Sequence, residues 1–459
     1  MESQFFNTLD GRPLDWVIFL DHKLGKLYQA IPFDEIASIL PYKKPKTGPV
    51  PWFDVKGGIG LQILKHHYRT SDENLIDLLN QNKMMQYFCG INLKAGQKIK
   101  DIGIVSRWRA RLGGYLAMSD VMTKFQLANV EHWKSDLENT ETNLSDATCY
   151  ESYIRYPTDV KLLWECITYL RSQMKKICKY VGIKMPRSKF KDQERKYLSY
   201  QKRRKKTYKL TRATIRRLLY LLHKFLGLLP GLIGAMKRKE AEALHSCRVK
   251  SNFFSRISTI KKIYEQQQLH FNYPKLKIKN RIVSLHKPYL RPIVRGKETK
   301  RVEFGMKVHE MQVDGINIIE HWNFEAYHEG VRMKKTTFKH RYLFKKKCTV
   351  FGGDQIYANN KNRKYCAREN ISTCFQPKGR PPVDKTVRKQ QSQLRSLIGK
   401  ERATRLEGSF GNKKNHYLLD KIKAKTFNTE IAWIFFGNMT ANAINIAKRN
   451  KPPSQKVAA

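Results

Sequence analysis

Acidic residues are scarce in this chain. Its 459 residues include 89 Lys and Arg but only 39 Asp and Glu, a formal net charge of +50. Such an excess of positive charge repels itself unless a polyanion offsets it; nucleic acid is the usual one, and an anionic membrane surface is the competitor. The hydrophobic fraction of 41% and the 11% of aromatic residues exclude a disordered basic tail. We therefore expect a folded nucleic-acid-binding protein of two or three domains.

Paired cysteines and an uninterrupted membrane span are also missing. The eight cysteines form no C-x-x-C pair, which argues against a zinc module and predicts reduced thiols. The N-terminus has no basic region followed by an apolar run, so no signal peptide is expected. Residues 218–236 approach the length of a membrane span, but His223, Lys224 and Pro230 interrupt them. We predict a packed helix and turn there, no membrane partner and a cytoplasmic location.

Hydrophobic spacing divides the chain into helical and mixed parts. Residues 1–135 read as a helical N-terminal domain, and residues 140–448 as an α/β domain with a basic helical insertion at 160–275. Residues 449–459 are a polar tail. Strands are predicted where apolar, β-branched and aromatic residues gather, at 146–154, 282–285, 302–311, 316–319 and 348–351, with Asp314-Gly315 as a hairpin turn. A capping box at Thr70–Glu73 predicts a helix start.

Basic residues recur at spacings that suit phosphate contact. Arg107 and Arg111 are four residues apart and therefore share one helix face. The densest run, residues 202–206, contains Arg203 and Arg204 between aromatic and apolar neighbours. We interpret these residues as DNA contacts; a solvated basic face is the alternative for both sets.

Three acids stand where the local structure is predicted to change. Asp146 lies on a strand, Asp354 follows an apolar strand and two glycines, and Glu407 lies in a basic helix. Three such carboxylates at one point would suit Mg²⁺ or Mn²⁺, and two ions could assist a phosphodiester displacement. Asp159 and Asp314 are rival acids, although a helix cap and an Asp-Gly turn explain them. The histidines at 66, 67 and 286 are further alternatives as metal ligands.

The order of several blocks resembles bacterial insertion-sequence transposases of the DDE, RNase-H-like type. The blocks are residues 146–148 with 155–159, residues 291–297 with 303–307, residues 353–357 with 362–366, and residues 407–411 with Lys414. Residues 52–112 are similar to the helical N-terminal domain that accompanies this catalytic domain. The resemblance implies an RNase-H-like mixed sheet, with Asp146, Asp354 and Glu407 as the catalytic metal ligands.

Some positions depart from the pattern of this type. A related signature has an Arg four residues before the Glu and a Tyr three residues before that Arg, where this chain has Ala403 and Lys400. Arg402 and Arg405 are the nearby arginines that could substitute for it, and we carry its role over to Arg405. Gln355 replaces the Lys that often follows the second Asp.

Two lysines beyond Glu407 complete the predicted site. Lys414 is seven residues after Glu407, hence on the same helix face, where its ammonium could hold a phosphate. We add its neighbour Lys413 to the predicted DNA contacts.

By this resemblance we expect a DNA transposase. It would use two Mg²⁺ (or Mn²⁺) ions to cut insertion-sequence ends and join the 3′-hydroxyl to target DNA. The expected partners are double-stranded DNA, from the terminal repeats and the target, and a second copy of the chain in a homodimer. The expected setting is the nucleoid of a bacterial cytoplasm. The alternative is a non-catalytic or inactivated nucleic-acid-binding protein.

Overall fold

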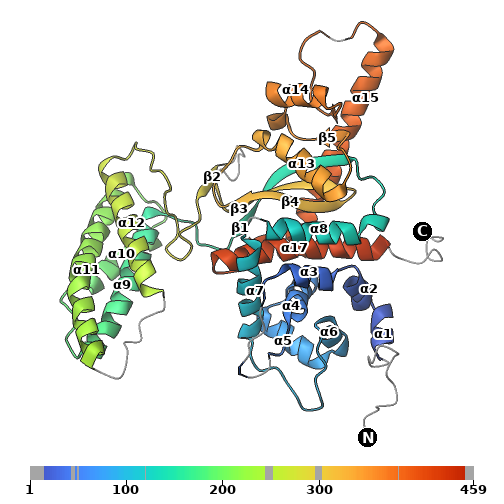
Figure 1. Cartoon of the computed structure of the whole chain (residues 1–459). Coiled ribbons are helices and arrows are strands. Elements are labelled where there is room, and N and C mark those ends of the chain that lie inside the picture. Colours follow the sequence, from blue (N-terminus) through green and yellow to red (C-terminus); the bar gives the residue numbers. More distant parts are fainter. Residues whose placement is uncertain are drawn as a thin grey trace. The chain divides into compact units, whose positions relative to one another are not determined.

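The computed structural model describes residues 15–42, 47–48, 51–118, 120–242, 252–294, 302–380 and 382–449. These residues form two compact units (Figure 1). Unit 1 combines the described parts of Met1–Tyr153 and Ile293–Ala459, and unit 2 is built from Ile154–Pro292. Parts of the predicted blocks and tail, residues 295–297 and 450–459, lie outside the described residues.

Helices make up the N-terminal part of unit 1, as predicted. Their bounds are α1 Asp15–Asp21, α2 Lys23–Gln29, α3 Phe33–Ile39, α4 Val55–Tyr68, α5 Asp72–Gln81, α6 Lys83–Phe88, α7 Gly103–Leu116, α8 Val121–His132 and the 3₁₀ turn η1 Lys134–Asp136. Helix α5 begins one residue later than the capping box predicted. Its N-cap is Ser71, whose hydroxyl accepts the N–H of Asn74 at 3.0 Å.

A curled mixed sheet forms the rest of the core of unit 1. Its strands are β1 Thr142–Ser152, β2 Pro292–Val294, β3 Val302–Val313, β4 Ile316–Asn323, β5 Val350–Gly352, β6 Ser372–Thr373 and β7 Lys421–Ile422. The order is β2-β3-β1-β5-β6, with β4 beside β3 and β7 beside β1. Strand β1 is antiparallel to β3 and parallel to β5. Asp314 and Gly315 have φ values of 46° and 77°, which confirms the two-residue hairpin turn between β3 and β4.

The strand predicted at residues 282–285 is wrong. This segment forms no strand, and Ile282 and Leu285 are buried in the core of unit 2. The N–H of Ile282 donates to the Gln266 side chain at 2.9 Å instead of to a neighbouring strand. The alternating apolar residues here pack an extended segment against helices. The same alternation occurs in a strand, so the hydrophobic period alone does not distinguish the two.

Further helices surround the sheet of unit 1. They are η2 Glu329–Val331, α13 Met333–Phe344, η3 Gln355–Tyr357, α14 Asn360–Arg368, α15 Lys385–Glu401, the π-helical turn η4 Arg402–Leu406, α16 Glu407–His416 and α17 Phe427–Arg449. Helix α17 packs along α7 and α4 and also contacts β4. A Cβ atom on Gly113 of α7 would lie only 1.9 Å from the carbonyl oxygen of Asn428 on α17. The N-terminal helices and the sheet therefore share one compact unit, and the domain division predicted at residues 135–140 lies inside it.

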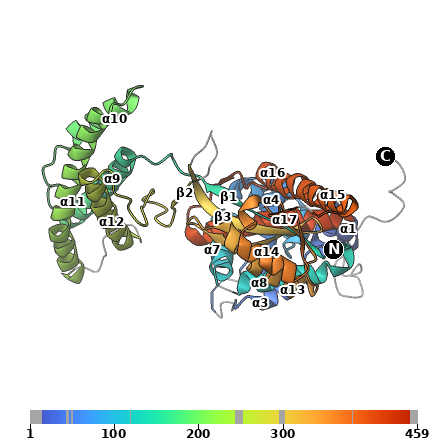
Figure 2. The same ribbon diagram turned by 90° about the horizontal axis from the view of Figure 1, so that it is seen from above.

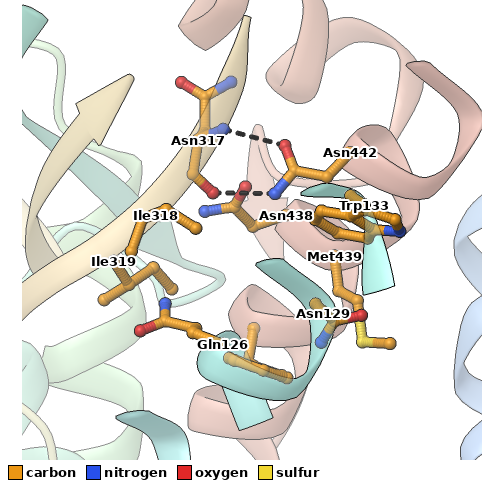
Figure 3. Close-up of a pocket in the computed structure, with 10 residues that line it drawn as sticks. Gln126, Asn129, Trp133, Asn317, Ile318, Ile319, Asn438, Met439 and Asn442 are labelled. Carbon is orange, nitrogen blue, oxygen red and sulfur yellow. Dashed lines mark hydrogen bonds between the residues drawn. The ribbon is translucent and has the colours of Figure 1, made fainter. Parts of the chain in front are cut away.

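Side chains from α8, β4 and α17 line a small cavity (Figure 3). Asn442 accepts the N–H of Asn317 at 2.9 Å and donates to the carbonyl of the same residue at 2.8 Å, so its amide joins α17 to β4. The cavity measures about 20 Å³, close to the space of one water molecule. It is therefore a packing feature and is too small for a substrate.

Unit 2 is a bundle of four helices, α9 Asp159–Val181, α10 Phe190–Lys202, α11 Tyr208–Glu242 and α12 Phe253–Asn272 (Figures 1 and 2). The predicted helix and turn at 218–236 is instead part of one continuous helix, with Pro230 inside it. Residues Tyr208–Ala241 are long and apolar enough to cross a membrane by length and composition. Leu218, Leu222 and Phe225 on this helix are nevertheless buried in the bundle core. The predicted packing is confirmed.

Candidate active site

Asp146 lies in the middle of the central strand β1 and is largely buried. Its Oδ1 accepts the N–H of Ala147 at 2.7 Å, and its Oδ2 accepts a hydrogen bond from Arg402 at 2.8 Å. Burial raises the pKa of this carboxyl, and the negative charges of Glu329 and Asp354 raise it further, whereas the Ala147 N–H and Arg402 oppose the rise. Asp146 is therefore one member of a group of acids.

Asp354 follows the strand that runs parallel to β1. In the register of these strands Leu144 is paired with Gly352; Asp146 and Asp354 each follow this pair by two residues, and the charge of Asp354 acts on Asp146. A Cβ atom on Gly352 would lie 2.6 Å from the Leu144 side chain. Glycine thus leaves room here for the end of the Leu144 side chain. Asp354 then caps η3, where its Oδ1 accepts the N–H of Gln355 at 2.6 Å.

Glu407 reaches the same place through Arg402. The Arg402 guanidinium lies 3.2 Å from Glu407 Oε1 and 2.8 Å from Asp146 Oδ2, so it joins two of the three predicted acids. Asp354 and Arg402 also line one pocket. The structure therefore links Asp146 to Glu407 through one guanidinium, and Asp354 lies near enough for its charge to act on Asp146.

The position of Arg402 depends on the π-helical turn η4, Arg402–Leu406. In a regular α-helix the residue four before Glu407, Ala403, would share its face. The wider turn adds one residue, so that Arg402, five before Glu407, faces it instead. Arg405, the predicted substitute, pairs with Glu401 at 2.5 Å on the exposed side of the helix. Of the two arginines that the sequence offered, Arg402 and not Arg405 therefore contacts Glu407.

Lys413 is buried and its ammonium pairs with Glu310. Burial lowers the pKa of Lys413, and Glu310 opposes that shift. Glu310 also accepts the Tyr150 hydroxyl at 2.6 Å, and it is the cross-strand neighbour of Asp146. The pair thus fastens α16 to the strand beside Asp146, which is a structural role. Lys414 is half-buried, with its ammonium 5.9 Å from the Tyr150 ring centre.

The other predicted DNA contacts are far from these acids in the sequence. Arg107 is exposed and pairs with Asp101. Arg111 is exposed, with its guanidinium 4.8 Å from the Trp108 ring centre. Arg203 and Arg204 are exposed in the connection between α10 and α11 of unit 2.

The rival acids have structural partners. Asp159 belongs to unit 2, where it accepts hydrogen bonds from Arg281 at 2.5 Å and Gln267 at 3.0 Å. Asp314 pairs with Arg449 at 2.7 Å next to the hairpin turn. Among the histidine alternatives, His66 is buried against the Tyr417 carbonyl. The turn explanation is confirmed for Asp314, whereas the cap predicted at Asp159 is wrong, because Thr158 is the N-cap of α9 and Asp159 is its first residue.

The donor atoms of this site suit a divalent cation, but their present spacing does not. Carboxylate oxygens are the ligands that Mg²⁺ and Mn²⁺ prefer. Within the described residues, no three His, Cys, Asp or Glu side chains lie close enough together to hold a metal ion. Arg402 supplies the positive charge that Asp146 and Glu407 share. The acids would have to close around a cation, with the guanidinium moved aside.

A pocket of about 410 Å³ adjoins the acids. Asp354 and Arg402 lie in its wall, together with Gln355, Cys374, Phe375, Gln376, Ser392, Arg395, Ser396 and Gly399. Its volume falls in the range of roughly 300–1,000 Å³ that small-molecule sites occupy. The site therefore has room for part of a substrate beside the carboxylates.

The N-terminal helices match a known protein family. Residues 13–111 match the family described as "Transposase domain (DUF772)". The chain is 26% identical over 118 residues to the "Uncharacterized protein ORF8 in nfe locus" of Rhizobium meliloti; this match covers 26% of the chain and 56% of that protein. No solved structure matches. The family match supports a protein related to transposases and ends before β1, so the carboxylates lie outside it.

Proposed function

We propose that this protein is a DNA transposase of the DDE type, which cuts insertion-sequence ends and joins the 3′-hydroxyl to target DNA. The observation that carries the proposal is that Arg402 pairs with both Asp146 and Glu407, while Asp354 acts on Asp146 by its charge and shares a pocket wall with Arg402. These acids come from segments up to 261 residues apart (407 − 146). The transposase-domain match in the preceding helices supports the same function.

The three carboxylates would hold the Mg²⁺ or Mn²⁺ ions, two by the proposed chemistry. Bound divalent cations would lower the pKa of an attacking water or hydroxyl and neutralise charge on the phosphate. Before the ions bind, the positive charge of Arg402 would offset the repulsion between the carboxylates of Asp146 and Glu407. Afterwards its guanidinium would be free to contact a phosphate oxygen.

The proposal extends to the fold and the partners. The order of β1, β3, β4 and β5, with Asp146 and Asp354 on parallel neighbours, supports an RNase-H-like arrangement. The formal net charge of +50 supports double-stranded DNA as the partner. Pairing of two DNA ends would require a homodimer, in a bacterial cytoplasm at the nucleoid.

Glu407→Gln tests the catalytic assignment. The probe is a labelled duplex that contains the DNA bordering the coding sequence, with Mg²⁺, and the readouts are strand cleavage and joining. Because several kcal/mol of charge stabilisation would be lost, we expect cleavage to fall by at least about 100-fold, with duplex binding retained.

Glu401→Gln is the matched control, because Glu401 is an acid six residues earlier that pairs with Arg405. It should cleave like the wild type. Equal cleavage by Glu407→Gln and wild type would refute the proposed site. Binding without cleavage in the wild type itself would favour the non-catalytic alternative.

A further inference from the structure

The pocket beside the acids has one wall made by a single face of α15. Ser392, Arg395, Ser396, Gly399 and Arg402 all line it. Their spacings of three, four, seven and ten residues from Ser392 repeat the helical period, so they form one stripe along the helix. The stripe ends at Arg402, which contacts two of the candidate catalytic acids. The pocket is thus an extension of the proposed active site.

Small residues keep this stripe open. Two serines and one glycine stand between and beside the two arginines. A Cβ atom built on Gly399 would have no heavy atom within 4 Å, so no side chain of the described residues fills the space beside it. Elsewhere in unit 1, Gly113, Gly352 and similar glycines are packed tightly against other segments. Unlike those glycines, Gly399 is therefore not packed against another segment, and the space beside it is open.

Arg395 is an uncommitted cation in this pocket. It is half-buried, and among the residues that the structure describes it forms no hydrogen bond or ion pair. The neighbouring Arg402 and Arg405 both hold carboxylates. A guanidinium presents a planar fork of donors that matches phosphate oxygens, and a pocket that leaves such a fork without an anion is suited to receive one.

We propose that this pocket receives the backbone of the DNA strand beside the cut, and that Arg395 binds one of its phosphates. This inference rests on the proposed function. Seven residues separate Arg395 from Arg402, about 10.5 Å along an α-helix. One DNA strand advances about 3.4 Å per nucleotide along the helix axis, so Arg395 reaches a phosphate about three nucleotides from the cleaved bond. Ser392 and Ser396 lie beside it as further hydrogen-bond donors.

The test measures DNA affinity with and without one phosphate charge. The probes are duplexes with the DNA bordering the coding sequence, each with a single neutral methylphosphonate at successive positions around the cut. We expect Arg395→Ala to bind the unmodified duplex roughly ten- to hundredfold more weakly. We also expect the wild type to lose a similar factor at one position, about three nucleotides from the cut, where Arg395→Ala loses nothing more.

Two further variants keep this test decisive. Lys389→Ala removes one positive charge from the same helix, about 120° away around its axis, and should lower affinity less than threefold at every position. Arg395→Lys should recover part of the lost affinity while the thermal stability of both Arg395 variants stays that of the wild type. A loss of stability in Arg395→Ala equal to its loss of binding would overturn the proposal.

The proposal would also be overturned if the losses of affinity from Arg395→Ala and from the methylphosphonate simply added at every position. No single phosphate would then face Arg395. The scan reads affinity, whereas Glu407→Gln reads cleavage. A failure of the pocket assignment is therefore distinguishable from a failure of the proposed catalytic function.

Discussion

His66 is a buried imidazole that connects the N-terminal helices to the segment after α16. Its Nδ1 lies 2.8 Å from the carbonyl oxygen of Tyr417, 351 residues away, and must donate to it. Its ring meets the ring of Trp433 edge-on, with centroids 5.7 Å apart. Burial lowers the pKa of His66 to about 3, and the hydrogen bond to Tyr417 only partly opposes this shift. The folded protein therefore holds this imidazole neutral.

Acid should destabilise the protein through this residue. Between pH 6.5 and about 3 the unfolded chain binds a proton on His66 that the folded chain does not, so stability falls as the pH falls. At pH 5 this loss should be about 2 kcal/mol relative to pH 7. Urea unfolding of wild type and His66→Asn at both pH values measures it: the wild type should lose more stability than the variant. His416→Asn, which removes an exposed imidazole, should behave like the wild type; equal pH dependence in all three would contradict the assignment.

The π-helical turn between α15 and α16 sets which arginine meets the acids. Its wider turn adds one residue to the helix. Ala403 within this turn is exposed. Removing one residue there should restore an ordinary α-helix in which Arg402 stands four residues before Glu407, still on the same face.

Deletion of Ala403 should therefore be tolerated. We expect cleavage within about tenfold of the wild type, because the shorter helix keeps Arg402 and Glu407 on one face. Insertion of one Ala after Ala403 is the matched control. It would turn Arg402 about 100° away from Glu407 and should abolish cleavage. Loss of cleavage in the deletion, with unchanged thermal stability, would show that the π turn itself is needed.

Most of the local structure could be predicted from hydrophobic period and turn chemistry, as the Asp314-Gly315 hairpin illustrates. The errors share a cause, since residues 282–285 and the 218–236 helix are decided by neighbours in the unit 2 core and not by local period. Asp146, Asp354 and Glu407 could be chosen only by resemblance. The choice between Arg402 and Arg405 could not be made from the sequence, because a π turn has no sequence signature as strong as a cap or a glycine turn.

Positive charge is concentrated in unit 2 at the scale of the whole molecule. Residues 154–292 contain 36 Lys and Arg against 7 Asp and Glu, so they carry +29 of the net +50 in under a third of the chain. The five residues from Lys202 to Lys206 are all exposed. Unit 2 is therefore suited to bind a polyanion through its own surface.

Neutralising this run should change the salt dependence of DNA binding. With Lys202–Lys206 all replaced by Gln, the plot of log affinity against log salt should become shallower by up to about 4, since each phosphate contact contributes about 0.9. Filter binding between 50 and 200 mM salt, as roughly the range over which such contacts weaken, measures the slope. The exposed Lys345, Lys346 and Lys347 of unit 1, replaced by Gln, serve as the control. An unchanged slope would mean that this run does not touch DNA.

The contact of Gly113 with Asn428 has a consequence for where the DNA would be cut. It joins α7, most of which lies in the region that matches the transposase-domain family, to α17 of the same compact unit as the carboxylates. If the helices of that region bind a terminal repeat, the compact unit fixes the distance between the repeat and the carboxylates. Shifting the repeat by one base pair would carry the target bond about 3.4 Å past the acids. The cut would then fall at one constant offset from the repeat, and an end of altered spacing would be cut at a different phosphate or left whole.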